Sequence, residues 1–147
     1  MHLLAAQRGS LSDDGEALDL AQSPGDVLFL SAADTELAAL AGACEGAGMR
    51  WRLANLMQLK HPLSVDTYAA KSVAKAKLVV VRALGGASYF AYALEAIHAA
   101  AVASGARIAV LPGDERPDPE LAGFSTLGED VRSQLLFYLA EGGTRNF

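Results

Sequence analysis

Leu78-Val79-Val80-Val81-Arg82-Ala83-Leu84-Gly85-Gly86 is the stretch of sequence that decides the fold. Its first four residues are continuously apolar, which is typical of a strand buried on both faces of a parallel sheet. The glycine pair that follows is typical of a turn into a helix. Residues 27–30 and 108–111 repeat this apolar character, whereas 49–54 is more mixed. We therefore predict four strands, with the run around Trp51 on the outside of the sheet.

Helical periodicity follows each of these runs, at residues 37–44, 64–76, 88–104 and 129–141. Alternating strands and helices predict an α/β fold, a flavodoxin-like three-layer sandwich with a mostly parallel sheet and strand order 2-1-3-4. Ser64 is the expected N-cap of the second helix. Residues 2–7 and 16–20 flank turn-prone segments, which predict a small N-terminal hairpin or edge ribbon. Residues 112–128 are expected to form one long loop.

Composition limits the kind of protein. The chain has 147 residues, of which 52% are hydrophobic, and this predicts a single domain over 1–147 with a substantial core. A net charge of -5 argues against nucleic acid and against an anionic membrane surface as partners. Cys44 is the single cysteine, and no apolar run approaches the ~20 residues of a membrane-spanning helix. We therefore expect a cytoplasmic protein without disulfides.

Ligands of open α/β sheets bind beyond the carboxyl ends of the strands, so the loops after the predicted strands are the first candidates for a site. Gly85 and Gly86 open a helix whose N-terminus can receive a phosphate or carboxylate, and Arg82 can add a bidentate donor. The alternative is a tight strand-to-helix turn that needs glycine backbone. The sequence contains neither GxGxxG nor GxxxxGK[ST], so no dinucleotide fingerprint or P-loop is present.

The other loops hold two further candidates. Asp34, or its neighbour Thr35, is expected to cap the first long helix. His61 follows the second strand, where it could bind a metal, transfer a proton or make hydrogen bonds at the surface. The three histidines of the chain have no metal-ligand spacing, so we assign no catalytic residue and no metal ligand.

Four segments at these same loops resemble a known family. They are residues 30–37, 53–68, 79–86 with Tyr89 and Tyr92, and 110–114. Together they closely resemble the beginning of the large subunit of aerobic cobaltochelatase, which is similar to the large porphyrin-binding subunit of magnesium chelatase. The resemblance extends over essentially all 147 residues in order.

The resemblance implies a metal–nitrogen ligase that uses ATP, Mg²⁺ and Co²⁺ to make a cobalt corrinoid. Its reaction is cobalt insertion into hydrogenobyrinic acid a,c-diamide, in aerobic cobalamin biosynthesis. It also implies a large subunit that holds the tetrapyrrole, with AAA+-type and integrin-like partner subunits that hydrolyse ATP. This chain would then be an N-terminal fragment of a much longer subunit, inactive alone and without a cofactor of its own.

Five residues are the expected contacts to substrate or to partner chains, as donors, helix-end NH groups and a stacking ring, because they are predicted to cluster at the carboxyl ends of the strands. They are His61, Arg82, Gly85, Gly86 and Tyr89. Two other functions remain open: a protein-interaction module that docks the partner subunits or the remainder of the large subunit, and an independent flavodoxin-like small-ligand domain.

Overall fold

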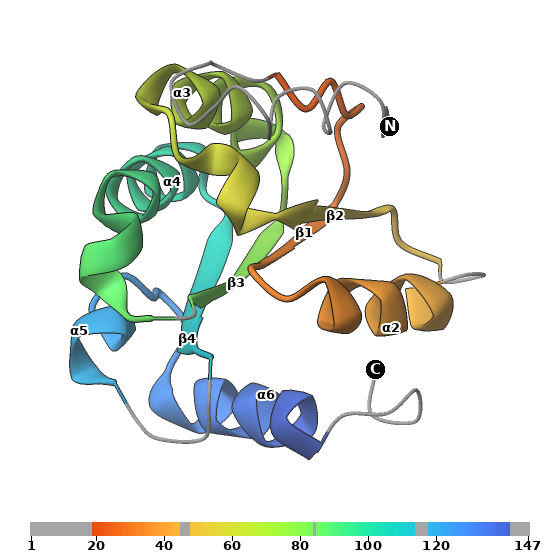
Figure 1. The fold of residues 1–147 in the computed structure, drawn as a ribbon, viewed down its shortest axis with the longest axis vertical. Helices are drawn as coiled ribbons and strands as arrows, with labels where there is room; N and C mark the ends of the chain where they lie inside the picture. The colour runs from red at the N-terminus through yellow and green to blue at the C-terminus, as the bar shows by residue number, and fades with distance from the viewer. Residues whose placement is uncertain (1–18, 45–47, 84, 114–117, 142–147) are drawn as a thin grey trace.

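A computed structural model describes residues 19–44, 48–83, 85–113 and 118–141. One sheet of four parallel strands runs through it in the order β2-β1-β3-β4 (Figure 1). The strands are β1 (Val27–Ser31), β2 (Trp51–Asn55), β3 (Leu78–Ala83) and β4 (Arg107–Pro112). The predicted order is confirmed, with the Trp51 strand at one edge. The predicted N-terminal hairpin lies largely outside the described residues.

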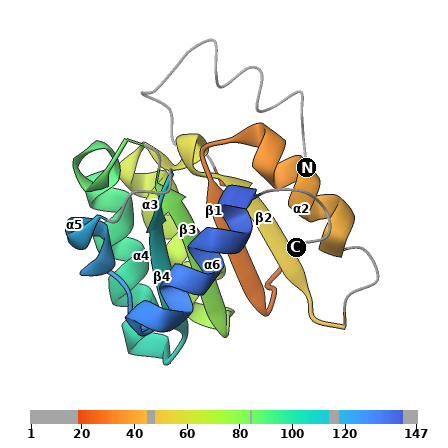
Figure 2. The ribbon, with the colours of Figure 1, turned by 90° about the horizontal axis from the view of Figure 1, so that it is seen from below.

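Helices cover both faces of the sheet, which confirms the three-layer α/β fold (Figures 1 and 2). On one face lie α3 (Pro62–Lys71), α4 (Ala91–Ser104) and the short α5 (Pro119–Ala122). The opposite face carries α2 (Asp34–Cys44) and α6 (Glu129–Glu141). Three 3₁₀ turns complete the elements: η1 (Leu56–Leu59), η2 (Val73–Lys75) and η3 (Ala87–Phe90).

The core is divided by the sheet into a large and a small part. Alternate strand residues such as Leu28, Val79 and Ile108 are fully buried against α3 and α4. The residues between them, Phe29 and Val80 among these, pack on the other face against α2 and α6. Side chains of a strand alternate between faces, so burial on both sides explains why the central runs are continuously apolar.

The predicted long loop after β4 contains more structure than its composition indicates. Helix α5 begins after Asp118, whose carboxylate accepts hydrogen bonds from the backbone N–H groups of residues 120 and 121. The chain then passes along the outer side of β4, where the N–H of Thr126 donates to the carbonyl of Ile108 at 2.8 Å. The hydroxyls of Thr126 and Ser125 accept from the N–H groups of Ile108 and Val110. This edge of the sheet is therefore covered by the chain itself.

Candidate functional site

The strand order creates a switch point at the carboxyl ends of β1 and β3. The chain leaves β1 towards α2 on one face and leaves β3 towards α4 on the other (Figure 1). Open α/β sheets bind ligands where neighbouring connections diverge in this way. The polar groups at this point therefore define the candidate site.

A buried ion pair fills the switch point. The Nη1 atom of Arg82 lies 3.2 Å from Oε2 of Glu36, and the two side chains are 9% and 12% exposed. Nη2 of Arg82 donates to the carbonyl of Gly113 at 3.0 Å, just beyond β4. The hydroxyl of Ser31 donates to Oε1 of Glu36 at 2.8 Å and accepts from the N–H of Ala33. Glu36 therefore neutralises the charge of Arg82. Among the described residues, Nε and Nη1 of Arg82 are buried without a hydrogen-bond partner.

A second cluster lies on the surface beside the switch point. Nζ of Lys60 is 3.0 Å from the hydroxyl of Tyr89 and 4.8 Å from the centre of its ring. Tyr89 is 52% exposed, and its ring meets the buried Phe90 edge-on at 4.7 Å between centroids. Gly85 and Gly86 have φ values of 94° and 90°, which side chains with a Cβ rarely adopt. The glycine pair therefore allows the sharp turn that places Tyr89 next to Lys60.

His61 follows Lys60 in the chain and directly precedes α3. Its Nδ1 accepts a hydrogen bond from the N–H of Leu63 at 3.1 Å, so His61 is the N-cap and Pro62 the first helical residue. The prediction that Ser64 caps this helix is wrong, because Ser64 lies inside the helix and is buried. Proline at the first position and an acceptor before it account for the earlier start. This capping bond uses Nδ1, so Nε2 is the ring nitrogen that remains for another contact.

Asp34 also differs from its predicted role. It is the first residue of α2 and not its cap, and its Oδ1 accepts from Nδ2 of Asn55 at 2.7 Å. Asn55 in turn accepts from the N–H of Met57 at 2.8 Å. The two side chains therefore tie the loop after β1 to the loop after β2.

The sequence predictions missed several residues of this edge: Glu36, Asn55, Lys60 and Asp66. Asp66 accepts from the hydroxyl of Tyr92 at 2.7 Å, and this hydrogen bond is the main reason that the pKa of Tyr92 is raised. The one usable signal was spacing, since Glu36 lies in the first turn of a helix that follows a strand. The hydrogen-bond partners of Asn55, Lys60 and Asp66 lie 21 to 29 residues away in the sequence, so no local sequence pattern reveals them.

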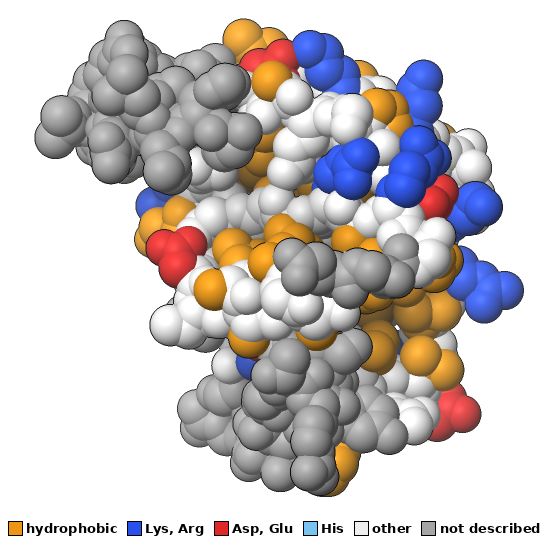
Figure 3. Space-filling view, turned by 90° about the vertical axis from the view of Figure 1, so that its right-hand side faces the viewer, with side chains coloured by type: hydrophobic (Ala, Val, Ile, Leu, Met, Phe, Trp, Pro, Cys, Tyr) orange, Lys and Arg blue, Asp and Glu red, His pale blue; other side chains and the backbone are white. Residues whose placement is uncertain are grey.

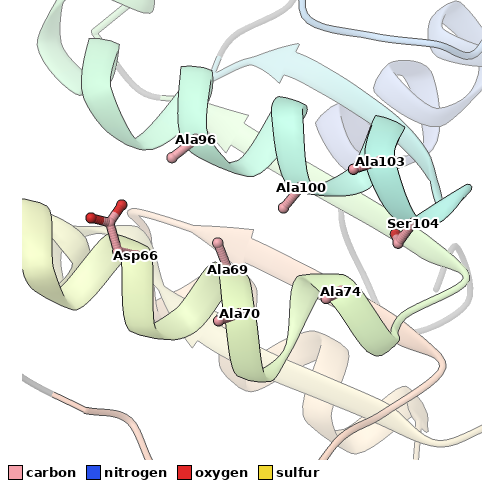
Figure 4. A pocket seen from close by; sticks show the side chains of 8 residues that line it. All are labelled: Asp66, Ala69, Ala70, Ala74, Ala96, Ala100, Ala103 and Ser104. Carbon is pink, nitrogen blue, oxygen red and sulfur yellow. The ribbon is translucent and has the colours of Figure 1, made fainter.

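Two hollows lie elsewhere on the described surface. One is a shallow apolar groove of about 460 Å³ between the α3–η2 segment and α4. Figure 4 shows the side chains that line it. Its lining is Asp66, Ala69, Ala70, Ala74, Ala96, Ala100, Ala103 and Ser104. A second cavity, of about 340 Å³, lies between the end of β4 and α6, with Arg132 and Glu129 among its polar residues.

The described residues contain no group of three or more His, Cys, Asp or Glu side chains that could hold a metal ion. Within the same residues, no helix has the length and apolar character needed to cross a membrane.

Comparison with known proteins gives a consistent result. No protein-family model matches the chain. The chain is 57% identical over 148 residues to aerobic cobaltochelatase subunit CobN of a Sinorhizobium species, and 36% identical over 149 residues to the subunit of the same name from Pseudomonas aeruginosa. Each alignment covers 99% of this chain and 12% of the relative, so the chain spans only a small part of these proteins.

The fold has a similar relative among solved structures. The catalytic subunit of cobaltochelatase from Mycobacterium tuberculosis superposes with a TM-score of 0.65 and 30% identity. The match covers 83% of this chain and 9% of that one. The resemblance predicted from the four sequence segments is therefore confirmed.

Proposed function

We propose that this chain, homologous along 99% of its length to aerobic cobaltochelatase subunit CobN, is the N-terminal domain of the tetrapyrrole-binding subunit of an ATP-dependent cobaltochelatase. The reaction is cobalt insertion into hydrogenobyrinic acid a,c-diamide in aerobic cobalamin biosynthesis, with a metal–nitrogen ligase activity that this segment lacks on its own. The observation that carries the proposal is 57% identity over nearly the whole chain.

The same proposal assigns ATP, the metal ions and substrate binding to different parts of the complex. ATP and Mg²⁺ belong to AAA+-type and integrin-like partner subunits, and Co²⁺ is a substrate that enters the macrocycle in the remainder of the large subunit. This segment contributes binding surface. The absence of the GxxxxGK[ST] pattern from its sequence is compatible with that assignment.

The surface we assign to the tetrapyrrole is the cluster at the carboxyl edge. The half-exposed ring of Tyr89 offers an aromatic face, and Lys60 beside it offers an ammonium group. A flat macrocycle edged with carboxylates and amides can stack on the ring and bond the ammonium. His61 and the backbone N–H groups of Gly85 and Gly86 add donors along the same edge. Arg82 acts here by positioning the loop after β4 through its bond to Gly113.

Steady-state kinetics of the reconstituted chelatase tests this assignment. In the long subunit that carries this segment, we expect Tyr89→Ala with Lys60→Ala to raise KM for hydrogenobyrinic acid a,c-diamide about tenfold, or ~1.4 kcal/mol. The kcat for cobalt insertion should change little, because the cluster binds without reacting. Val102→Ala, exposed on α4, is the matched control. An unchanged KM in the double variant contradicts the surface assignment, and a wild-type complex that inserts no cobalt contradicts the function.

A second function is favoured by the exposed apolar side chains at this edge. Met57, Leu63, Tyr89 and Tyr92 are 40%, 57%, 52% and 45% exposed on the segments that follow β2 and β3. Such side chains are typical of protein interfaces. In this alternative the edge docks the partner chelatase subunits. Capture of those subunits by the long subunit without tetrapyrrole, lost in Leu63→Asp with Tyr92→Asp, distinguishes it from direct substrate contact.

A further inference from the structure

Positive charge gathers at the opposite edge of the sheet, where the strands begin. We define the basic edge by five residues: Arg50, Arg52, Lys75, Lys77 and Arg107. Arg52 is half-buried and the other four are exposed. Figure 3 shows Lys and Arg side chains gathered on one part of this side of the molecule. Because the whole chain carries a net charge of -5, the basic edge is a local reversal of sign.

Backbone hydrogen bonds hold four residues in a row where the strands begin, three of them from the basic edge and the fourth the anion Asp26. The N–H of Asp26 donates to the carbonyl of Arg50 at 2.7 Å, and the N–H of Lys77 donates to the carbonyl of Asp26 at 2.8 Å. The N–H of Arg107 donates to the carbonyl of Lys77 at 3.0 Å. One residue therefore stands at the start of each strand, in sheet order. Neighbouring strands are about 4.8 Å apart, within a Debye length of about 8 Å, so the charges of Lys77 and Arg107 reinforce each other. Asp26 stands between Arg50 and Lys77 and offsets part of their charge.

Little of this charge is neutralised within the described residues. Asp26 pairs with Arg50 at 3.4 Å. The guanidinium of Arg52 is held by the backbone carbonyl and hydroxyl of Ser23, at 3.0 and 2.9 Å, and neither group is charged. Lys75, Lys77 and Arg107 have no side-chain ion pair in the described part of the chain.

Arg52 is also held in place by its packing. A Cβ at Gly25 would lie 2.6 Å from Cγ of Arg52 and 3.1 Å from the carbonyl of Arg50. Glycine at this position therefore lets the arginine stem lie flat on the backbone. The guanidinium is consequently ordered before any partner arrives, which reduces the entropy lost on binding.

We propose that the basic edge docks a carboxylate-rich surface of the remainder of the longer polypeptide to which this segment belongs. The inference rests on the part of the proposed function that makes this chain a segment of a longer subunit, since it covers 12% of its relatives. A tethered partner needs little intrinsic affinity, because its effective concentration reaches the millimolar range. Exposed cations with weak individual pairing suit such a contact.

The same features disfavour nucleic acid as the occupant. A duplex requires many cations along an extended track, and the remaining surface of this acidic chain repels phosphate. The cations of the basic edge span only the width of a four-stranded sheet. A compact group of carboxylates matches that width.

Zero-length carbodiimide cross-linking of the full-length subunit tests the docking. The sample is an equal mixture of ¹⁴N- and ¹⁵N-labelled subunit with the partner chelatase subunits added, and linked peptides are identified by mass spectrometry. We expect Lys75 and Lys77 to link to Asp or Glu residues outside these 147 residues, within peptides of a single isotope. The double variant Arg50→Glu with Arg107→Glu should lower the yield of those links at least fivefold. Lys71 and Asp19, an ion pair away from the row, should link equally in both proteins and serve as the control.

Four results overturn the proposal. Mixed-isotope links would assign the edge to a second copy, and links to a partner subunit would assign it to another chain. Absence of links from Lys75 and Lys77 while Lys71 still links to Asp19 would leave the edge unoccupied. Binding of a fluorescent DNA duplex that the double variant loses would assign the edge to nucleic acid. Cobalt insertion is not measured, so failure of the proposed activity gives a different and separable result.

Discussion

The two edges of the sheet use the same kinds of side chain in opposite ways. At the carboxyl edge, Arg82 and Glu36 form an ion pair whose side chains are 9% and 12% exposed. At the amino edge, Arg50 and Asp26 form one whose side chains are 64% and 20% exposed. Burial removes water from the first pair and leaves it around the second. The first pair therefore determines local structure, whereas the second stays in contact with water and contributes little to stability.

The comparison is tested most strongly by removing the buried cation. Arg82→Ala leaves Glu36 buried without its partner, and we expect the free energy of unfolding to fall by about 3–5 kcal/mol. Urea denaturation followed by circular dichroism measures this. Arg82→Met with Glu36→Leu, which removes both charges, should recover most of the loss. A single variant as stable as the wild type would show that the pair does not hold this edge together.

The next largest difference in stability is expected between two glycine-to-alanine substitutions, one at each edge of the sheet. Gly86 has a φ of 90° and a ψ of 177°, a region that is essentially restricted to glycine. We expect Gly86→Ala to destabilise the fold by about 1–3 kcal/mol, measured by the same denaturation. Gly48 precedes β2 on the amino side, and a Cβ added there would have no neighbouring atom within 4 Å. Gly48→Ala should therefore lie within about 0.5 kcal/mol of the wild type. Equal losses in both variants would contradict the strain argument.

The smallest effect is expected at the exposed pair. The pKa of Asp26 lies below its ordinary value of 3.8, first because its carboxylate accepts from the backbone N–H of Arg50 and then because of the Arg50 side chain. Arg50→Ala keeps the backbone bond, so the pKa should rise only part of the way back towards 3.8. Carboxyl NMR titration measures this shift, with Asp19 and its partner Lys71 as the unchanged control.

The sign of the associated pH effect follows from the lowered pKa. A depressed carboxyl pKa stabilises the fold above the pKa of the unfolded chain, and this contribution disappears as pH falls through the folded value. Wild-type protein should therefore lose more stability than Arg50→Ala on acidification below 3.8. A pKa that stays unchanged in the variant would show that the guanidinium adds nothing to the backbone bond.

The fold was largely predictable because the order of apolar residues within short segments indicates each strand and each long helix. Continuous runs such as 78–81 indicated buried strands, and the mixed run around Trp51 indicated an edge strand. Helix α5 was missed because it has only four residues and one buried anchor, Leu121. The start of α3 was misplaced because His61, a residue not among the usual N-caps, accepts the first hydrogen bond.

The site was less predictable because it depends on residues distant in sequence. The glycine pair indicated the turn that precedes Tyr89, but the hydrogen-bond partner of Tyr89, Lys60, is 29 residues away. Arg82 was expected to be a ligand donor, and nothing local indicates that Glu36, far earlier in the chain, neutralises it. The basic edge is equally invisible in sequence, because only the strand order brings Arg50, Lys77 and Arg107 to the same edge of the sheet.

The hydrogen bonds that the hydroxyls of Ser125 and Thr126 accept from the backbone of β4 have a consequence for self-association. An uncovered edge strand offers its N–H and C=O groups to any other extended chain, which is a common start of aggregation and of strand-addition binding. Here the N–H groups of Ile108 and Val110 are already occupied by side-chain oxygens. The sheet is thereby protected from recruiting a further strand at β4.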